Sequence, residues 1–317
     1  MRARVTLAAV AALTVLAAAG CSGDSSPLPG PPGASAAPAP AAAAPADTSC
    51  NPRASRRPTG ALTEPGRMPA GSYMAEIQKR GRLILGTSQD TLLFSSRNPF
   101  TGKVEGFDVA MGQQIAAAIF GDPGKIQIKV IAYDERVSSA VDGSVDVVAD
   151  TMTANCARWK DVDFSSIYYD AGQKVLVSSA SRAKSIEDLG GQKVCAAKGS
   201  TSYDNIAKVA AKPIPVDRPG FGDCLVAFQQ NEVDAISTDD TILVGLAAQD
   251  PYAKVVGPRF TDEPYGMAIS NDHPEFTRFV NAVLAKNRAD GTWKSTYERW
   301  LGDFGAAPKP PVAEYRD

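Results

Sequence analysis

The sequence predicts an α/β fold, because short β-rich runs alternate with helical patterns over residues 73–304. Residues 83–86 form an apolar run typical of a strand, residues 108–120 carry a helical pattern, and residues 126–130 alternate apolar with polar side chains. The same order of elements returns in the second half of the chain. Such alternation is typical of sheets covered by helices, and about 230 residues suffice for one two-lobed unit or two small domains.

The first helix is defined by its core face and by its end. Apolar residues recur four positions apart at Met111, Ile115 and Ile119. Gly121 and Pro123 then end the helical pattern. A shorter helix over 135–141 and a strand over 145–148 follow. The apolar residues of these elements are expected to form core.

A helix over 223–230 and a strand over 233–236 repeat the pattern of the first half. In each half a strand runs into a polar loop, at 150–153 and at 237–240. Ligands of open α/β sheets lie outside the carboxyl ends of the strands, so both loops are candidates for a binding site. A lone Thr or Asp after a strand also serves as a helix cap, which is the alternative.

A third strand-to-helix transition carries small residues. A strand over 194–197 leads into the turn 198–202 and then into a helix that includes Ile206, Val209 and Ala210. The unpaired amides and positive dipole end at such a helix start suit a carboxylate. We therefore predict an anion contact at this turn.

Residues 1–20 predict a signal peptide that ends at a lipidation site. Arg2 and Arg4 form a basic start, an apolar run follows, and small residues precede Cys21 in a pattern that matches a bacterial lipobox, with Ala18 where leucine is usual. The apolar run of about 16 residues is shorter than the roughly 20 that span a bilayer. Lipid on Cys21 would hold the protein on the extracytoplasmic face of the cell membrane. An ordinary signal peptide or an uncleaved anchor is the alternative.

Two segments are predicted to lie outside the folded body. Residues 21–72 are rich in Pro, Ala, Ser and Gly and predict a disordered tether, because they offer few large apolar side chains for a core. Residues 305–317 carry three prolines and predict an extended tail. Cys50 would then fasten the end of the tether to the body.

Charge and histidine content exclude several functions. The chain has a net charge of −2, and residues 1–20 contain two arginines and no acid, so the mature chain would carry −4. This balance gives no footprint for nucleic acid. His273 is the only histidine, which argues against a histidine-based catalytic triad. We predict no cofactor and no metal, because the cysteines lack the short paired spacing of metal sites.

Four cysteines remain once Cys21 is assigned to lipid. An exported chain can form disulfides, so we expect two, for which three connectivities are possible. These cysteines are Cys50, Cys156, Cys195 and Cys224.

Several short motifs occur together between residues 80 and 301. They are Gly106-Phe107-Asp108, Thr153 followed by Arg158, Val162-Asp163-Phe164-Ser165, Tyr168-Tyr169, Lys198-Gly199-Ser200-Thr201, Val233-Asp234-Ala235, Thr238-Asp239 and Pro264-Tyr265-Gly266. Through these motifs the sequence resembles the polar amino-acid-binding proteins of ABC importers, the bacterial extracellular solute-binding proteins, family 3. The run Ser-Thr-Asp-Asp-Thr-Ile-Leu at 237–243 and the cysteines at 195 and 224 give a closer likeness to actinobacterial glutamate/glutamine-binding lipoproteins.

The resemblance implies a two-lobed periplasmic-binding-protein type II fold with two crossover strands and a hinge. Lobe 1 would comprise residues 73–173 and 265–304, and lobe 2 residues 174–264, with crossings near 171–174 and 263–267. On this assignment Cys195 and Cys224 share lobe 2 and are expected to be joined, which leaves Cys50 to pair with Cys156. We expect a monomer.

The resemblance also implies the contacts to an amino acid. Arg158 would clamp the α-carboxylate in a bidentate pair, and the amides and hydroxyls of Thr153 and Thr201 would complete its shell. Asp239 would accept hydrogen bonds from the α-ammonium, helped by Thr151. A surface ion pair for Arg158 and a helix cap by Asp239 are the alternatives.

The residues that set side-chain specificity are less clear from the sequence. We favour Arg136 for a distal carboxylate, because it begins a helix beside the loop that would face the cleft; Arg97 and Lys198 are the alternative cations. Glutamate, aspartate or glutamine is then the preferred ligand. Tyr133 is a possible wall of the site, with core packing an equal alternative. The remaining candidate contacts are Ser88 and Thr238.

Two functions share this pocket. The first is a transport receptor that delivers its amino acid to an ABC permease, and the second is a sensor that docks on a membrane signalling protein. An enzyme is not expected, because the candidate residues contain no histidine and no evident acid/base pair.

Overall fold

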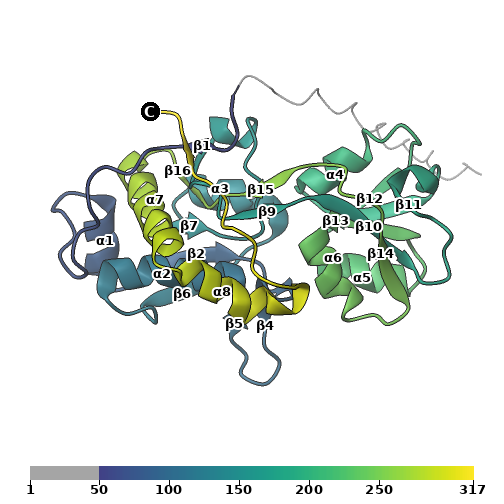
Figure 1. The fold of residues 1–317 in the computed structure, drawn as a ribbon, viewed down its shortest axis with the longest axis horizontal. Helices are drawn as coiled ribbons and strands as arrows, with labels where there is room; N and C mark the ends of the chain where they lie inside the picture. The colour runs from purple at the N-terminus through teal and green to yellow at the C-terminus, as the bar shows by residue number, and fades with distance from the viewer. Residues whose placement is uncertain (1–49) are drawn as a thin grey trace, which may run out of the picture. The chain divides into compact units, whose positions relative to one another are not determined.

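The computed structural model describes residues 50–317 (Figure 1). The predicted signal peptide, the lipidation site at Cys21 and the tether up to residue 49 lie outside the described residues. Within residues 50–317, no helix combines the length and the apolar character needed to cross a bilayer.

Lobe 1 is built on a five-stranded sheet of order β6-β2-β7-β16-β8. Strand β2 pairs in parallel with β6 and β7, whereas β16 runs antiparallel to β7 and β8. The strands are β2 (Leu83–Thr87), β6 (Ile126–Val130), β7 (Val147–Val148), β8 (Val162–Phe164) and β16 (Ala268–Ser270). The helices of this lobe are α1 (Tyr73–Arg80), α2 (Phe107–Phe120), α3 (Arg136–Val141), α7 (Pro274–Ala289) and α8 (Thr292–Leu301), with the short 3-10 helices η1 (Tyr133–Glu135), η2 (Arg158–Lys160) and η4 (Gly302–Phe304).

The predicted core face of the first helix is confirmed. Met111, Ile115 and Ile119 are fully buried and belong to the cluster that joins α2, α7 and α8 to the sheet. Gly112 lets α2 approach β2 closely, because a Cβ at this position would lie 2.6 Å from a methyl carbon of Leu85. The helix ends with Gly121 at φ +76°, the left-handed conformation that glycine adopts readily.

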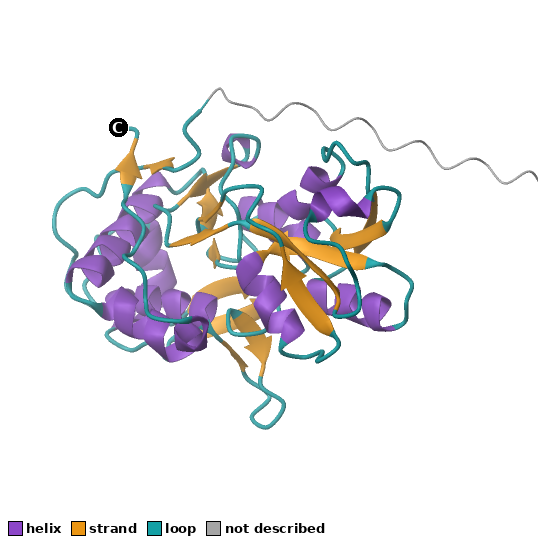
Figure 2. Cartoon of the chain, turned by 45° about the vertical axis from the view of Figure 1, so that its right-hand side comes forward, coloured by secondary structure: helices purple, strands orange, loops and turns teal. Residues whose placement is uncertain are grey.

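Lobe 2 has its own five-stranded sheet of order β12-β11-β13-β10-β14. Figure 2 shows helices packed on the sheets of both lobes. The strands are β10 (Gln173–Ser178), β11 (Lys193–Ala197), β12 (Ile214–Arg218), β13 (Ala235–Asp239) and β14 (Ala253–Val256). The helices are α4 (Thr201–Ile206), α5 (Phe221–Gln229), α6 (Asp240–Ala247) and the 3-10 helix η3 (Ile186–Leu189).

Two predicted boundaries in lobe 2 were wrong. Helix α4 ends at Ile206 and does not extend through Val209 and Ala210. Strand β13 continues through Asp239, beyond the predicted end at residue 236, because it pairs with β10 over its whole length. This extension places Asp239 at the end of a strand and at the first turn of α6.

A two-stranded antiparallel sheet connects the lobes. It pairs β9 (Tyr169–Ala171) with β15 (Glu263–Tyr265). The resemblance implied crossings near 171–174 and 263–267; β15 lies within the second range, whereas β9 overlaps the first only at Ala171, because residues 173 and 174 already belong to β10. Lobe 1 also carries a small sheet of β3 (Asp90–Thr91), β4 (Ser95–Arg97) and β5 (Val104–Glu105).

The structure contains the two disulfides that the lobe assignment implied. Cys195 on β11 is joined to Cys224 on α5, within lobe 2. Cys50 is joined to Cys156, across 106 residues of sequence. The second bond fastens the N-terminal segment two residues before Arg158.

The terminal segments lie on the body, in contrast to the predicted tether and tail. Residues 50–72 were assigned to a disordered tether, but β1 (Ala54–Ser55) pairs in parallel with β17 (Glu314–Tyr315) near the C-terminus. Asp163 accepts hydrogen bonds from both Arg56 and Arg316. The composition gave little core signal here because polar contacts and a disulfide hold these segments together with only a few apolar side chains, among which Met68 joins the core of lobe 1.

Candidate functional site

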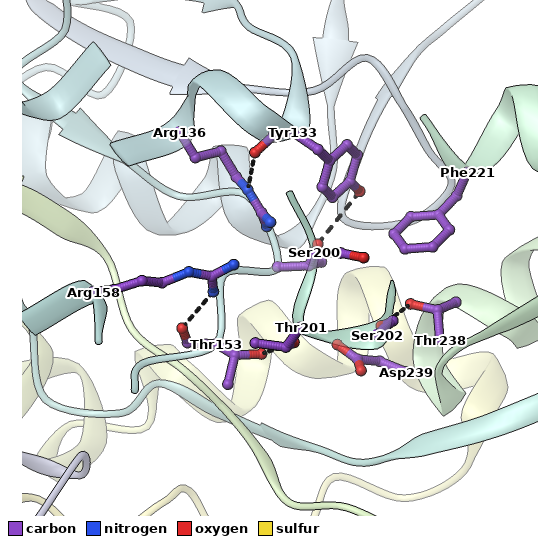
Figure 3. Close-up of a pocket in the computed structure, with 11 residues that line it drawn as sticks. Tyr133, Arg136, Thr153, Arg158, Ser200, Thr201, Ser202, Phe221, Thr238 and Asp239 are labelled. Carbon is purple, nitrogen blue, oxygen red and sulfur yellow. Dashed lines mark hydrogen bonds between the residues drawn. The ribbon is translucent and has the colours of Figure 1, made fainter. Parts of the chain in front are cut away.

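A small cavity lies between the two lobes, beside the loop after β7 and the end of β13. About 200 Å³ in and around it is free of protein atoms, a volume that includes space open to solvent. Eleven side chains line it: Tyr133, Arg136, Thr151, Thr153 and Arg158 from lobe 1, and Ser200, Thr201, Ser202, Phe221, Thr238 and Asp239 from lobe 2. In Figure 3 the guanidinium groups of Arg136 and Arg158 point toward the middle of the cavity, and Asp239 lies on its other side.

Arg158 contributes a cation that forms no ion pair within residues 50–317, although the charges of Glu263, Asp204 and Asp239 act on it. It starts η2, where its amide donates to Asn155 Oδ1 at 2.9 Å. Its guanidinium donates to two backbone carbonyls, Thr153 at 2.7 Å and Gly199 at 3.0 Å. Burial and the nearby charge of Arg136 lower the pKa of Arg158 to about 9. The guanidinium is still charged at pH 7. An anion in the cavity would offset both the burial and the repulsion by Arg136, and would raise the pKa of Arg158 again.

Arg136 lies at the start of α3, and only 3% of its surface is exposed. It donates to the carbonyls of Tyr133 at 2.9 Å, Asp150 at 3.0 Å and Gly199 at 3.3 Å. Its guanidinium also stacks on the Tyr133 ring, 4.5 Å from the centroid. These acceptors are neutral, and a guanidinium has five N–H donors, so Arg136 retains donors for a ligand.

Gly199 brings lobe 2 against this pair of arginines. Its carbonyl accepts from both guanidinium groups, and its φ of +73° lies in the left-handed region. A Cβ here would come within 2.7 Å of Cα of Asp134 in lobe 1. The turn predicted as an anion contact is therefore also a close contact between the lobes.

Asp239 is the acid of the cavity. Its Oδ2 accepts from the hydroxyl of Tyr265 at 2.6 Å, whereas its buried Oδ1 has no hydrogen-bond partner among residues 50–317. Burial, followed by the charge of Glu263, raises the pKa of Asp239 well above the usual range. The carboxylate does not cap α6, so the cap alternative is excluded. A cation beside Oδ1 would satisfy this oxygen and favour its ionised form.

Thr151 is held in an unusual backbone conformation at the cavity. Its φ is +42°, a left-handed value that β-branched residues rarely adopt. Its amide donates to Asp108 Oδ2 at 2.7 Å, and Tyr168 donates to the other oxygen at 2.6 Å. Burial raises the pKa of Asp108 to about 7. A buried carboxyl thus fixes the loop that follows β7.

Thr153 and Thr201 meet from opposite lobes. Their hydroxyl oxygens are 3.4 Å apart, and each hydroxyl also donates to the carboxylate of Glu263 on β15. Thr238 lies beside them and accepts from Ser202 Oγ at 3.0 Å. All four predicted threonines, Thr151 included, line the cavity.

Two predicted ligand contacts do not line the cavity. Ser88 is buried beside it, where its amide donates to Asp150 and its hydroxyl bonds to Thr91 and Ser95. Lys198 is exposed and forms an ion pair with Asp134 at 2.8 Å. Lys198 lies in the predicted turn 198–202 and Ser88 follows the predicted strand 83–86, but their side chains are engaged elsewhere.

Sequence reasoning missed Ser200, Ser202 and Phe221. The two serines flank Thr201 in a turn that was already a candidate, so their position was a usable signal. Phe221 begins α5 and meets Tyr133 edge-on, with ring centroids 5.1 Å apart. No local pattern marks Phe221, because its contact depends on how the two lobes meet.

The lobes, the connecting sheet and the cavity define a two-lobed binding protein. The family model of the bacterial extracellular solute-binding proteins, family 3, matches residues 83–303, so the chain belongs to this family. This match confirms the family and the type II fold expected from the motifs.

Two named relatives and a solved structure agree with this family assignment. The ABC transporter glutamine-binding protein GlnH of Bacillus subtilis is 37% identical over 229 residues, 72% of this chain and 84% of GlnH. The glutamate-binding protein GluB of Corynebacterium glutamicum is 30% identical over 254 residues, 76% of this chain and 86% of GluB. An ancestral arginine-binding protein bound to glutamine superposes with a TM-score of 0.66 at 33% identity, covering 70% of this chain and 99% of that one. All three are named as binding proteins, in agreement with the expectation that the chain is not an enzyme.

Proposed function

We propose that this protein binds a polar α-amino acid in the cavity between its lobes and delivers it to an ABC importer. The observation that carries the proposal is a pair of opposite, uncompensated groups. Arg158 has only neutral carbonyl acceptors, and Asp239 Oδ1 has no partner. An α-amino acid supplies the missing anion and the missing cation in one molecule.

The physical reason is the cost of burying charge. An unpaired ion loses its hydration on burial, and a specific hydrogen-bonded counter-charge can offset that loss. The α-carboxylate would pair with Arg158, whose planar fork suits a bidentate contact. The α-ammonium would donate to Asp239 Oδ1.

Arg136 favours a ligand whose side chain accepts hydrogen bonds. A second guanidinium on the lobe 1 side disfavours lysine or arginine by repulsion, and it can pair with a distal carboxylate or amide oxygen. Tyr133 and Phe221 would enclose the aliphatic part of the ligand. Glutamate, aspartate and glutamine meet these requirements, and GlnH and GluB are named for glutamine and glutamate.

We also propose that lipid on Cys21 anchors the exported protein to the membrane surface, near its importer. This proposal rests on the signal-like residues 1–20 and the small residues before Cys21. Detergent phase partitioning tests it. The wild type should enter the detergent phase, and Cys21→Ser should stay in the aqueous phase.

Calorimetric titration with the twenty amino acids tests ligand binding. One or more of glutamate, aspartate and glutamine should bind far more tightly than lysine, arginine and leucine. Uptake of the best ligand should fall when the gene is deleted. Tight binding with unchanged uptake would instead support the sensor function.

A further inference from the structure

The loop that carries Arg158 is fastened on both sides of this residue. Two residues before it, Cys156 is joined to Cys50 by a disulfide. One residue after it, the indole nitrogen of Trp159 donates to the carbonyl of Pro52 at 3.0 Å. The backbone that presents Arg158 is therefore held at both ends by the same short N-terminal segment.

The C-terminal segment completes this attachment. The central carbon of the Arg316 guanidinium lies 3.8 Å from the centroid of the Trp159 ring, and the same guanidinium donates to Asp163 at 3.2 Å. Asp163 is 1% exposed on β8, and it also accepts from Arg56. Strand β1 ends directly before Arg56, and its partner β17 ends directly before Arg316. The two chain ends therefore meet beside the Arg158 loop.

We call residues 50–57 and 314–317 the terminal clasp. This clasp is also anchored on parts of lobe 1 other than the Arg158 loop. Ser55 is fully buried and donates to the carbonyl of Phe164 at 2.6 Å, and Asn281 on α7 donates to the Ser55 hydroxyl at 2.7 Å. The clasp can therefore serve as a fixed support for the loop.

The Arg158 loop contains little regular structure of its own. Arg158 lies in η2, a 3-10 helix of three residues, and 3-10 turns have poorer hydrogen-bond geometry than α-helices. Its guanidinium bonds only to the carbonyls of Thr153 and, across the cavity, Gly199 within residues 50–317. A bidentate contact to a carboxylate requires a defined direction of the guanidinium, so a small shift of the loop costs affinity. The position of Arg158 therefore depends on contacts outside the loop.

We propose that the terminal clasp positions Arg158 for the ligand carboxylate, with Cys156 and Trp159 as the positioning residues through which it acts. The proposal rests on the function proposed above. Residues 50–57 and 314–317 do not line the cavity, so the clasp makes no ligand contact of its own. It contributes to affinity through the Arg158 loop, in addition to its contribution to stability.

The second disulfide separates the effect on affinity from the effect on stability. Cys195 and Cys224 are fully buried in the core of lobe 2. Removal of either disulfide should destabilise the protein, because each one restricts the unfolded chain. Only removal of the bond between Cys50 and Cys156 should displace Arg158.

Paired alanine variants test the proposal. Cys50→Ala, Cys156→Ala removes the bond of the clasp, and Cys195→Ala, Cys224→Ala is the matched control. Both should lower the thermal unfolding midpoint. The titrations use glutamate or glutamine, whichever the wild type binds better, at a temperature where both variants are folded. Affinity should fall by about tenfold or more in the first variant and by less than about threefold in the control. Equal losses in both variants would make the clasp a stabilising element only and would overturn the inference.

A substitution that leaves both disulfides intact gives an independent test. Trp159→Phe keeps an aromatic ring under Arg316 but removes the donor to Pro52. Affinity should fall by about three- to tenfold. Trp300→Phe on α8 is the matched control, because Arg299 stacks on Trp300 in the same way outside the Arg158 loop. Wild-type affinity in Trp159→Phe would contradict a role of this residue in positioning.

A double-mutant cycle identifies Arg158 as the route of the effect. In an Arg158→Ala background, Cys50→Ala, Cys156→Ala should cause little further loss of affinity. A further loss as large as that in the wild-type background would show that the clasp does not act through Arg158. Circular dichroism establishes that each variant is folded.

Hydrogen exchange without ligand reports the loop directly. Backbone amides of residues 155–161 should exchange faster in Cys50→Ala, Cys156→Ala than in the wild type, whereas the control should leave them unchanged. If the wild type binds an amino acid and the variant binds it equally well, the inference is wrong and the proposed function stands. If the wild type binds none, the proposed function is wrong and exchange decides the inference: unchanged rates overturn it, and faster rates show that the clasp fixes the Arg158 loop.

Discussion

The two lobes contribute opposite chemistry to the same cavity. Lobe 1 supplies Arg136 and Arg158, whose hydrogen bonds go to neutral carbonyls. Lobe 2 supplies Asp239, whose Oδ1 has no partner, together with the hydroxyls of Ser200, Thr201, Ser202 and Thr238. Neither lobe can neutralise its own charged groups within the cavity. If the protein binds a zwitterion as proposed, recognition is divided between the lobes, so that a ligand must bridge them to satisfy both.

The lobes also differ in how they hold their charged groups. Arg158 lies in a loop fastened by the Cys50–Cys156 disulfide, and neighbouring Trp159 donates to the Pro52 carbonyl at 3.0 Å and packs under the Arg316 guanidinium. The Asp239 side chain accepts a hydrogen bond from Tyr265, and its backbone pairs with Gln173 of β10. The cation side is thus braced by the segment around residue 50 and by the C-terminal segment, whereas the carboxylate of the acid side is held from the connecting sheet.

The largest expected effect is loss of the cation on lobe 1. Arg158→Ala should weaken amino-acid binding by about 2–5 kcal/mol, which is roughly thirty- to several-thousand-fold, because the ligand carboxylate is left buried without its partner. Arg158→Lys should restore little, since an ammonium cannot form the bidentate fork. Calorimetric titration measures both, with Arg182→Ala as the exposed arginine control. Near-native affinity in a folded Arg158→Ala would show that lobe 1 does not supply the carboxylate clamp.

On lobe 2 the acid is removed by Asp239→Asn. This substitution keeps the shape of the side chain but removes its charge, so amino-acid binding should weaken by about 1.5–3 kcal/mol, roughly ten- to a hundredfold. The wild type should bind glutarate more weakly than glutamate, and this difference should shrink in the variant, because the missing ammonium no longer has an acid to meet. Equal preference for glutamate over glutarate in both proteins would place the ammonium elsewhere.

The role of Arg136 sharpens the comparison within lobe 1. Arg136→Gln should weaken glutamate and aspartate about tenfold more than glutamine, since only the acids lose a charge-assisted contact to the distal group. Lys198→Gln is the control, because this exposed lysine lies outside the cavity lining. Equal losses for the three ligands would make Arg136 a structural residue, consistent with its stacking on Tyr133.

The smallest expected effect is a dependence on pH from the acid side. Burial raises the pKa of Asp239 in the empty protein, and a ligand ammonium should lower it, so binding releases a proton wherever the pH lies below the raised pKa. Affinity should then fall with decreasing pH by at most about tenfold per pH unit. Titrations in buffers of different ionisation enthalpy measure this proton, and Asp239→Asn should abolish its release.

Raised carboxyl pKa values should make the stability of the empty protein fall as pH rises, whereas ligand affinity should rise with pH. A carboxyl whose pKa is raised by folding contributes stability below the ordinary aspartate pKa and loses it as pH rises through the raised value. Asp108, with a pKa of about 7, should lower the unfolding midpoint of the empty protein between about pH 4 and 7. The raised pKa of Asp239 should likewise lower the stability of the empty protein as pH rises. A midpoint that rises steadily over this range would contradict these burial effects.

Local sequence patterns determined much of the fold. Four-residue spacing identified the core face of α2, and alternation identified β6, because side-chain periodicity follows directly from backbone geometry. The sequence placed Asp239 in a loop at a strand end, and the resemblance singled out Arg158; the structure brings both to one cavity. The cysteine pairing also followed once the lobes were assigned.

Only the tertiary structure decided which side chains face the cavity. Phe221 joins the lining and Ser88 does not, although Ser88 lies in a predicted loop and Phe221 lies in none. The terminal segments pack on the body through a disulfide and ion pairs that compositional analysis does not detect. Glu263 had no local signal, because two of its hydrogen bonds come from threonines 110 and 62 residues away in sequence, whose hydroxyls reach it from different lobes. Periodicity specifies which residues a helix or strand buries, whereas the partners of a buried polar group depend on how distant parts of the chain meet.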